Sequence, residues 1–400
     1  MNLTQLSQLG IYISLAIYSF GALTSQSLLS LGGTLFVIAP ASYLLFQFKK
    51  NRLKVNGREK LLLSSSLLYI AFLLLNTLLR PEYGYRTGVL TFIPLYFIPL
   101  SGLIWERQSD ESFLKKVKNL TYYSLSLGTL VVFIKCLYQV LALDKEATGF
   151  FGVTIFFAYA CLPVFVFYFE KLLHSEKTVE KLSNAALMTM LFLMILMSAN
   201  RGTLLTILIF VPIRIFFFWI HDLKKLIPIL TLSITLICAF GVYYVSSPKF
   251  RGNTLTKLSK DPSVIGRLFL WKENLLIFKS NPLVGVVPKN NSISGAEAKE
   301  KDPFVRGLHR NLRYFAHSIY IQSLAENGVI GTFLFFLLFF SFLWLYPSSW
   351  PLILAILISG LTDTIFSTSR TLHAVFIQLI LWPIFFQPLK NKLKYKRVKH

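Results

Sequence analysis

A single histidine lies where a polar stretch of the sequence gives way to an apolar one. The segment FAHSIYIQSLAENGVIG, residues 315–331, contains His317 and two later glycines. Histidine exchanges a proton near neutral pH, so a histidine held by a rigid element suits general base chemistry, whereas a ring packed under lipid headgroups is the simpler alternative. The glycines would let a neighbouring helix approach closely. On one continuous helix, a single stripe would hold the histidine together with Ile321, Leu324, Gly328 and Gly331.

Two arginines carry the second chemical signal. Arg201 lies in the segment SANRGTLLTIL, and Arg267 lies at the start of the segment GRLFLWKENLLIFKSNPLVGV. A guanidinium is planar, always charged and able to donate two parallel hydrogen bonds, so a pair of them suits a diphosphate. Arginines that extend to lipid headgroups at a membrane edge are the alternative. Both interpretations depend on elements that place these residues at a membrane.

The composition predicts those elements. Of the 400 residues, 54% are hydrophobic and 37 are Phe, which is more apolar surface than a soluble core can bury. About twelve apolar runs are long enough to cross roughly 30 Å of hydrocarbon as helices. The sequence therefore predicts an all-α, polytopic integral membrane protein. The predicted spans are residues 8–24, 28–47, 61–79, 88–105, 120–142, 150–169, 185–200, 202–220, 226–246, 322–345, 350–367 and 372–388.

Lys and Arg in the short connections predict the orientation of these spans. Basic runs such as KKNRLKVNGREK at 49–60 and KNKLKYKRVKH at 390–400 follow even-numbered predicted spans. Positive charge tends to stay on the cytoplasmic side, so both termini are expected in the cytoplasm. The net charge of +23 follows mainly from these anchors, which would face membrane lipids. The basic runs lack interleaved aromatic residues, so no nucleic-acid partner is expected.

The connection between the ninth and tenth predicted spans is much longer than the others. It follows an odd-numbered span, so it is expected outside, and loops of such length are usually functional. Arg201, Arg267 and His317 then all lie near the outer membrane surface. The expected parts are helices one to nine in residues 1–246, a loop domain in 247–321, helices ten to twelve in 322–389 and a basic cytoplasmic tail in 390–400.

Within the loop domain, the sequence predicts a helix and a polar insert. Residues 266–286 form an amphipathic pattern that suits a helix on the membrane surface, ending near the segment SNP at 280–282. Residues 288–307 are polar and rich in small residues, which is typical of a mobile flap. The apolar stripe of the helix consists of Leu268, Trp271, Leu275 and Phe278.

These features together resemble the O-antigen ligase family, within the O-antigen ligase and polymerase superfamily. The family's signature is His, then Asn, Ser or Gln, nine residues, Gly, two residues, and Gly, Thr or Tyr. His317, Ser318, Gly328 and Gly331 match every position of it. The family's arginine pattern, Arg followed four positions on by Leu, is matched by Arg201 and Leu205.

Further parts of the chain extend the resemblance. The segment around Arg267 is similar to the family's loop helix, and GLTDTIFSTSR is similar to a late-helix pattern at Asp363 and Arg370. Many spans with one large periplasmic loop before the last three also resemble the architecture of GT-C-type glycosyltransferases. The residues expected to support the site are Ser318, Glu326, Gly328, Gly331, Asp363 and Arg370.

The resemblance implies a function in lipopolysaccharide synthesis. O-antigen polysaccharide would pass from undecaprenyl diphosphate to a sugar hydroxyl of lipid A core, at the periplasmic face of a Gram-negative inner membrane. The family is taken to invert configuration and to need no metal or other cofactor, and the outward segments contain no Asp-x-Asp pair that would hold a cation. Arg201 and Arg267 would bind the diphosphate, and His317 would act as the base or orient the acceptor hydroxyl.

Two alternatives remain open at this stage. An O-antigen polymerase or a protein oligosaccharyltransferase of the same superfamily would use similar arginines with another acceptor. A transporter of a lipid-linked or anionic substrate is the more distant alternative, although no internal repeat is visible. Among the other ionisable groups, Lys135 and Arg214 are expected to extend to headgroups or a water-filled crevice, while Arg80 and Arg86 would face an anionic lipid or core phosphate.

Overall fold

The computed structural model describes most of the chain. The described residues are 3–24, 57–80, 111–222, 262–286, 316–362 and 369–386, together with separate positions between 27 and 39 and between 224 and 235. Throughout these ranges the regular secondary structure is helical, which confirms the all-α prediction for them. The predicted spans 28–47, 88–105 and 226–246 lie wholly or mostly outside the described residues, as do the predicted flap at 288–307 and the basic tail.

Six described helices are long and apolar enough to cross a membrane. They are α3 (Gly57–Leu78), α5 (Glu111–Leu141), α6 (Thr154–His174), α7 (Thr178–Met197), α8 (Arg201–Trp219) and α14 (Ile319–Leu345). Each coincides with one of the predicted spans. The total of twelve stays a prediction.

Four other helices complete the described bundle. Toward the two ends of the chain lie α1 (Leu3–Thr24) and α16 (Ser369–Phe386). Helix α11 (Pro262–Ser280) belongs to the long connection. Helix α15 (Trp350–Gly360) follows α14 and is preceded by the 3-10 turn η3 (Pro347–Ser349). The predicted span 350–367 was too long for one continuous helix, because α15 ends at Gly360 and residues 361 and 362 form a turn.

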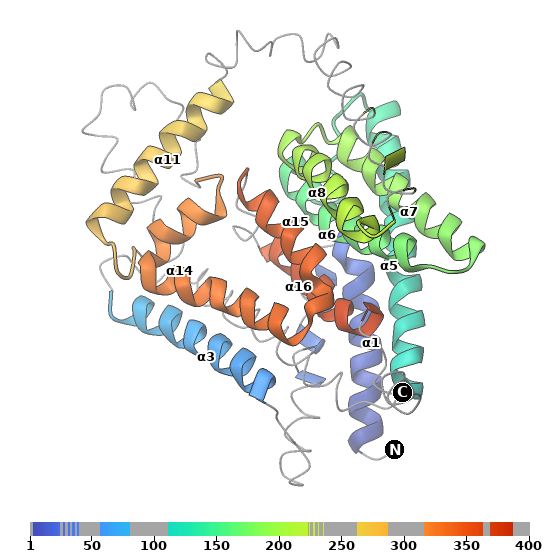
Figure 1. Cartoon of the computed structure of the whole chain (residues 1–400), viewed down its shortest axis with the longest axis horizontal. Helices are drawn as coiled ribbons and strands as arrows, with labels where there is room; N and C mark the ends of the chain where they lie inside the picture. The colour runs from blue at the N-terminus through green and yellow to red at the C-terminus, as the bar shows by residue number, and fades with distance from the viewer. Residues whose placement is uncertain are drawn as a thin grey trace.

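The helices form two groups that meet at α15 and α16 (Figure 1). In the first group α3 and α11 both pack on α14, and in the second α1 packs on α5 while α6 packs on α7. Helix α15 contacts α8 and α6, and α16 contacts α6 and α1, so α6 lies at the centre of the second group. Its central position requires apolar residues all round, and most of its side chains are buried.

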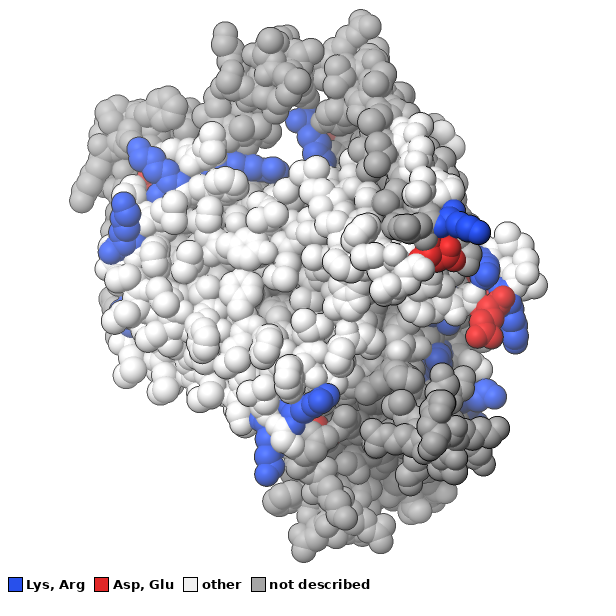
Figure 2. Space-filling view, in the orientation of Figure 1, with Lys and Arg blue, Asp and Glu red and all other residues white. Residues whose placement is uncertain are grey.

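The surface of the bundle carries its charges at the margins. Figure 2 shows a broad face almost without charged side chains, with Lys and Arg side chains gathered along its edges. Many large apolar side chains of the described helices are exposed, among them Leu67, Leu68, Leu127, Phe217 and Phe333. An apolar surface of this extent would be unstable in water, so it supports the assignment to membrane proteins.

Candidate active site at one end of the bundle

His317 lies in the turn that enters α14. Its φ is 47°, in the left-handed region that a residue with a Cβ rarely adopts, and Ser318 after it is extended, with φ −155° and ψ 124°. Such strain persists only where the surroundings enforce it, and it concentrates at functional sites. The side chain of His317 is partly exposed, whereas Ala316 and Ser318 on either side are buried.

The predicted helical stripe through His317 was therefore wrong. The helix begins two residues after the histidine, and it is interrupted at Gly328, where φ is 62° and ψ is −167°. The periodicity argument assumed one continuous helix across residues 317–331. The glycine prediction is confirmed in part, since a Cβ on Gly331 would collide with the ring of Phe72 on α3, so this glycine does permit a close helix approach.

A short chain of hydrogen bonds holds the turn that carries the histidine. The backbone N–H of Ala316 donates to Oε1 of Gln322 at 2.7 Å, and Nε2 of Gln322 donates to Oε1 of Glu326. Both side chains are buried. Glu326 was expected to support the site, and in the structure its carboxylate accepts the Gln322 bond that holds the turn before α14. Gln322 itself was missed, because nothing in its sequence context marks it.

Arg201 is the first residue of α8, and its side chain is exposed. The start of the helix is fixed by Asn200, whose side chain accepts a hydrogen bond from the backbone N–H of Thr203 at 2.8 Å, and Ala199 before it has a positive φ of 53°. The helix dipole adds partial positive charge at this end. The guanidinium and the helix terminus therefore create a local environment that favours an anion.

The end of α15 brings Arg201 and His317 to the same end of the bundle. A Cβ on Gly202, next to Arg201, would lie 2.9 Å from Oγ1 of Thr362, and a Cβ on Gly360 would collide with Ile319, two residues after His317. The starts of α8 and α14 thus lie against the same few residues. The hydroxyl of Tyr320 donates to the carbonyl of Leu357 at 2.8 Å and fixes this arrangement.

A second hydroxyl pair lies beside Arg201. The hydroxyl oxygen of Tyr159 on α6 is 3.2 Å from Oγ1 of Thr362, and both would meet a Cβ on Gly202. These contacts explain why glycine follows the arginine. Sequence reasoning missed the pair, since its members are 203 positions apart.

Arg267 lies on α11, which packs on the helix that follows His317 (Figure 1). The face of α11 that is buried includes Leu270, Glu273, Asn274 and Ile277. Ile277 and Val286 form an apolar cluster with Ala325 of α14. The side chain of Arg267 is partly exposed. The three residues predicted from sequence therefore lie on elements that are in contact with one another or share a neighbour.

Helix α11 agrees with the prediction in its end and differs in its packing face. It ends at Ser280, at the predicted Ser-Asn-Pro segment, and begins at Pro262, four residues earlier than expected. The predicted apolar stripe is not the face that packs on α14, because Leu268 and Leu275 are 58% and 40% exposed. That stripe remains available to a membrane surface, as the sequence suggested.

Some of the remaining predicted residues lie outside the described part of the chain, and others have contacts within it. Asp363 and Arg86 lie outside the described residues, as does the side chain of Arg370. Within the described ranges, no group of three or more His, Cys, Asp or Glu side chains is placed to hold a metal ion. The ammonium of Lys135 lies 3.6 Å from the ring centroid of Phe150, which is a cation–π contact.

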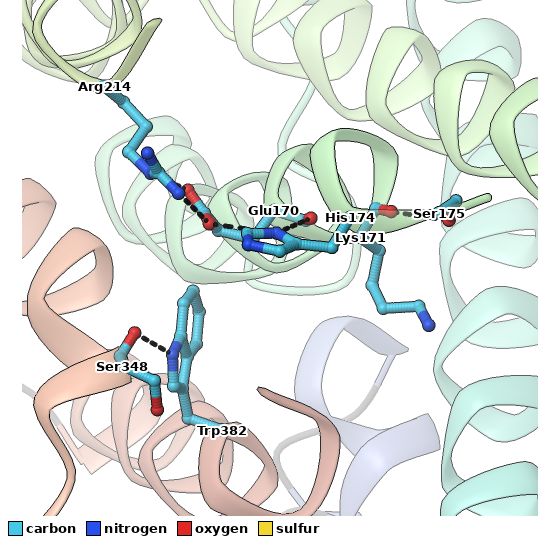
Figure 3. A network of polar contacts seen from close by, with 7 residues as sticks. All are labelled: Glu170, Lys171, His174, Ser175, Arg214, Ser348 and Trp382. Atoms are coloured by element: carbon cyan, nitrogen blue, oxygen red, sulfur yellow. Dashed lines mark hydrogen bonds and ion pairs between the residues drawn. The ribbon is translucent and has the colours of Figure 1, made fainter. Parts of the chain in front are cut away.

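Arg214 has a structural partner toward the other end of α8. Its Nε and Nη2 donate to the two carboxylate oxygens of Glu170 at 2.5 and 2.9 Å, and both residues are buried (Figure 3). Thirteen residues separate it from Arg201, about 20 Å along the helix. The expectation that Arg214 extends to headgroups or a crevice was wrong, because its charge is neutralised by a carboxylate on α6.

The described part of the molecule thus defines a helical membrane protein with two arginines and a strained histidine on adjoining elements at one end. Residues 185–336 match the family model described as O-antigen ligase, and this segment contains Arg201, Arg267 and His317. The match supports the resemblance: this part of the chain is similar to the O-antigen ligase family, whose members are glycosyltransferase-like ligases and polymerases. No curated protein matches the chain.

Proposed function

We propose that the protein is an O-antigen ligase of a Gram-negative inner membrane. It transfers O-antigen polysaccharide from undecaprenyl diphosphate to a sugar hydroxyl of lipid A core, on the periplasmic face, and needs no metal. The observation that carries the proposal is the common neighbourhood of three elements: the start of α8 with Arg201 and the turn with His317 meet at the end of α15, and α11 with Arg267 packs on α14. The family match covers all three.

The arginines act on the donor. Arg201 and Arg267 hold the two phosphates by bidentate hydrogen bonds, and the helix terminus at Arg201 adds to the positive potential. When the bond between the anomeric carbon and the phosphate oxygen breaks, the electron pair leaves with the diphosphate. Fixed guanidinium groups stabilise this charge as it develops, because they need not reorganise during the reaction.

The histidine acts on the acceptor. The oxygen of the core sugar hydroxyl attacks the anomeric carbon from the side opposite to the diphosphate, so the configuration is inverted. The proton of that hydroxyl passes to the imidazole of His317 as the new glycosidic bond forms. The strained turn and the Gln322 hydrogen bond at Ala316 restrict the movement of the histidine, which favours attack along one direction.

Complementation of a strain that lacks its own ligase tests the proposal. His317→Ala, Arg201→Ala and Arg267→Ala are compared with the unaltered protein at matched membrane levels, and polysaccharide attached to lipid A core is read on a gel. His174→Ala and Arg58→Ala are matched controls, since these two exposed residues lie on α6 and α3 and belong to none of the elements above.

The expected result separates the two groups of variants. The unaltered protein and both controls restore the ladder of modified lipid A core, while the three site variants lose it and accumulate carrier-linked polymer. A protein that leaves the core unmodified but lengthens the glycan on its carrier would be a polymerase, and the proposal would be wrong in its acceptor.

A further inference from the structure

The turn that follows α11 is bonded into the interruption of α14. Because α14 breaks at Gly328, the next two backbone N–H groups lose their usual partners in the helix. Val329 donates instead to the carbonyl of Pro282 at 2.8 Å, and Ile330 donates to the carbonyl of Leu283 at 3.1 Å. In return the N–H of Val286 donates to the carbonyl of Ala325 at 3.1 Å. Residues 281–286, here called the docking turn, thus replace a missing part of the helix.

Two glycines permit this exchange. Gly285 and Gly328 have φ values of 66° and 62°, and a Cβ on either would collide with the backbone of the other segment, at Glu326 and Leu283 respectively. Only glycine fits both the conformation and the space. The first glycine of the family signature is therefore explained by the docking turn, and not by a neighbouring helix as the stripe interpretation assumed.

Helix α3 and the residues after it hold the docking turn from a third side. Nη1 of Arg80 donates to Oδ1 of Asn281 at 3.1 Å and to the carbonyl of Gly285 at 2.6 Å. Nδ2 of Asn76 donates to the carbonyl of Val284 at 2.7 Å. Arg80 was expected to face an anionic lipid or core phosphate, and its guanidinium is directed at the turn instead. A charged donor that bonds two acceptors, one on the buried Gly285 and one on the partly exposed Asn281, is a strong constraint on their position.

We propose that Arg80 is a positioning residue for the transfer reaction. It fixes the docking turn on α14, and this sets where α11 carries Arg267 relative to His317 at the start of α14. Arg267 lies fourteen residues before Asn281, about 20 Å along α11. A small rotation of α11 at the docking turn therefore displaces Arg267 by a larger distance. A displacement of about 1 Å in a catalytic arrangement can cost roughly 100-fold in rate. The catalytic part of this inference rests on the proposed function, and the structural part does not.

A distance measurement tests the structural part without reference to any reaction. Spin labels are attached at Leu68 on α3 and Lys272 on α11, both exposed, in a variant without the three native cysteines. The unaltered Arg80 is expected to give one narrow distance distribution, and Arg80→Ala a distribution about twice as broad or more. Arg58→Ala is the matched control, because Arg58 lies on α3, which ends two residues before Arg80, and contacts α14, with its guanidinium 5.5 Å from the ring of Trp344. Its distribution should stay narrow.

A transfer assay with purified protein tests the catalytic part. Arg80→Ala is expected to lower kcat about 10- to 100-fold and to change the KM for the lipid-linked donor less than threefold, because misalignment affects the transition state more than binding. Arg80→Lys restores one of the two hydrogen bonds, so kcat should recover in part. Combining Arg80→Ala with Asn281→Ala should cost less than the product of the single effects, because the two side chains share one bond.

The outcomes are distinguishable. An unchanged distance distribution in Arg80→Ala overturns the inference, as does a broadened distribution with unchanged kcat, since Arg80 would then be structural only. A protein that transfers nothing to lipid A core overturns the proposed function, and the distance arm still decides whether Arg80 sets the position of α11.

Discussion

The two ends of α8 hold their arginines in different ways. Arg214 is buried, and its guanidinium forms two hydrogen bonds with the Glu170 carboxylate while it lies 5.0 Å from the Trp350 ring centroid. Arg201 is exposed at the first position of the helix, beside residues in strained or exceptional conformations. One end has its arginine neutralised within the protein, and the other has an exposed arginine at a helix N-terminus, where the proposed function places the diphosphate. In that proposal the same residue type serves packing at one end and substrate binding at the other.

The contrast extends to the backbone. Around Glu170 and Arg214 the chain stays helical, and the rings of Phe218 and Trp350 lie 5.2 and 5.0 Å from the Arg214 guanidinium. At the other end, His317 and Ala199 have positive φ values and Gly328 interrupts α14. The two non-glycine residues among them each cost about 1–3 kcal/mol of stability that regular helices would not lose. A cost of this kind is retained where it fixes reacting groups.

The largest expected effect comes from replacing His317. His317→Gly removes the proposed base, so transfer to lipid A core should fall by about 10² to 10⁴-fold. Glycine also relieves the left-handed backbone, so the free energy of unfolding should rise by up to about 1 kcal/mol. Transfer is measured on purified protein and stability by denaturant unfolding in detergent. His317→Ala keeps the strain and should lose activity without gaining stability, and equal stability of both variants would contradict the strain argument.

At the ion pair of Glu170 and Arg214 we expect a large loss of stability and little change in activity. Arg214→Ala leaves the Glu170 carboxylate buried without its partner, which should lower the free energy of unfolding by about 3–5 kcal/mol. Activity per folded molecule should change little, because the pair lies about 20 Å from Arg201. The yield of monodisperse protein after heating measures the first effect, and transfer normalised to folded protein measures the second.

A double variant provides the control for this pair. Glu170→Leu with Arg214→Met removes both charges and keeps an apolar volume, so most of the lost stability should return. If Arg214→Ala lowered transfer per folded molecule as strongly as Arg201→Ala, both ends of α8 would take part in catalysis and the comparison would fail.

The sequence was sufficient to predict the six long apolar helices of the described part of the chain. Apolar runs overlap α3, α5, α6, α7, α8 and α14, since hydrocarbon thickness requires their length, although α5 and α7 begin nine and seven residues before the predicted starts. Arg201 at a span boundary and His317 before an apolar run were visible for the same reason. Those predictions depend on local composition, which the sequence contains directly.

The parts that were wrong depend on contacts between distant residues. The break at Gly328 exists because the docking turn, more than forty positions earlier, supplies the bonds that α14 lacks there. Arg80 is 201 positions from Asn281, and Arg214 is 44 from Glu170. No periodicity records such pairs. The stripe through His317 was therefore drawn on a helix that the tertiary structure divides.

The two signature glycines should respond differently to the same substitution. Gly328→Ala and Gly331→Ala are each expected to lower the free energy of unfolding by about 1–3 kcal/mol, the first through a positive φ and a backbone collision, the second through overpacking. Phe72→Leu should restore part of the loss in Gly331→Ala, because the Phe72 ring is one of the groups in contact. It should restore nothing in Gly328→Ala, whose obstacle is the backbone of Leu283. Denaturant unfolding of the three single and two double variants measures this, and equal rescue of both would contradict the assigned contacts.

The smallest expected effect is at the start of α8. Asn200→Ala removes the hydrogen bond to the N–H of Thr203, which should lower the free energy of unfolding by about 1 kcal/mol. Because Arg201 follows directly, fraying of this turn should also raise the KM for the lipid-linked donor a few-fold while kcat stays within about twofold. Asn200→Asp keeps the acceptor and is the matched control. A larger loss of activity in Asn200→Asp than in Asn200→Ala would indicate that a negative charge here competes with the diphosphate, and it would locate the anion at the helix terminus itself.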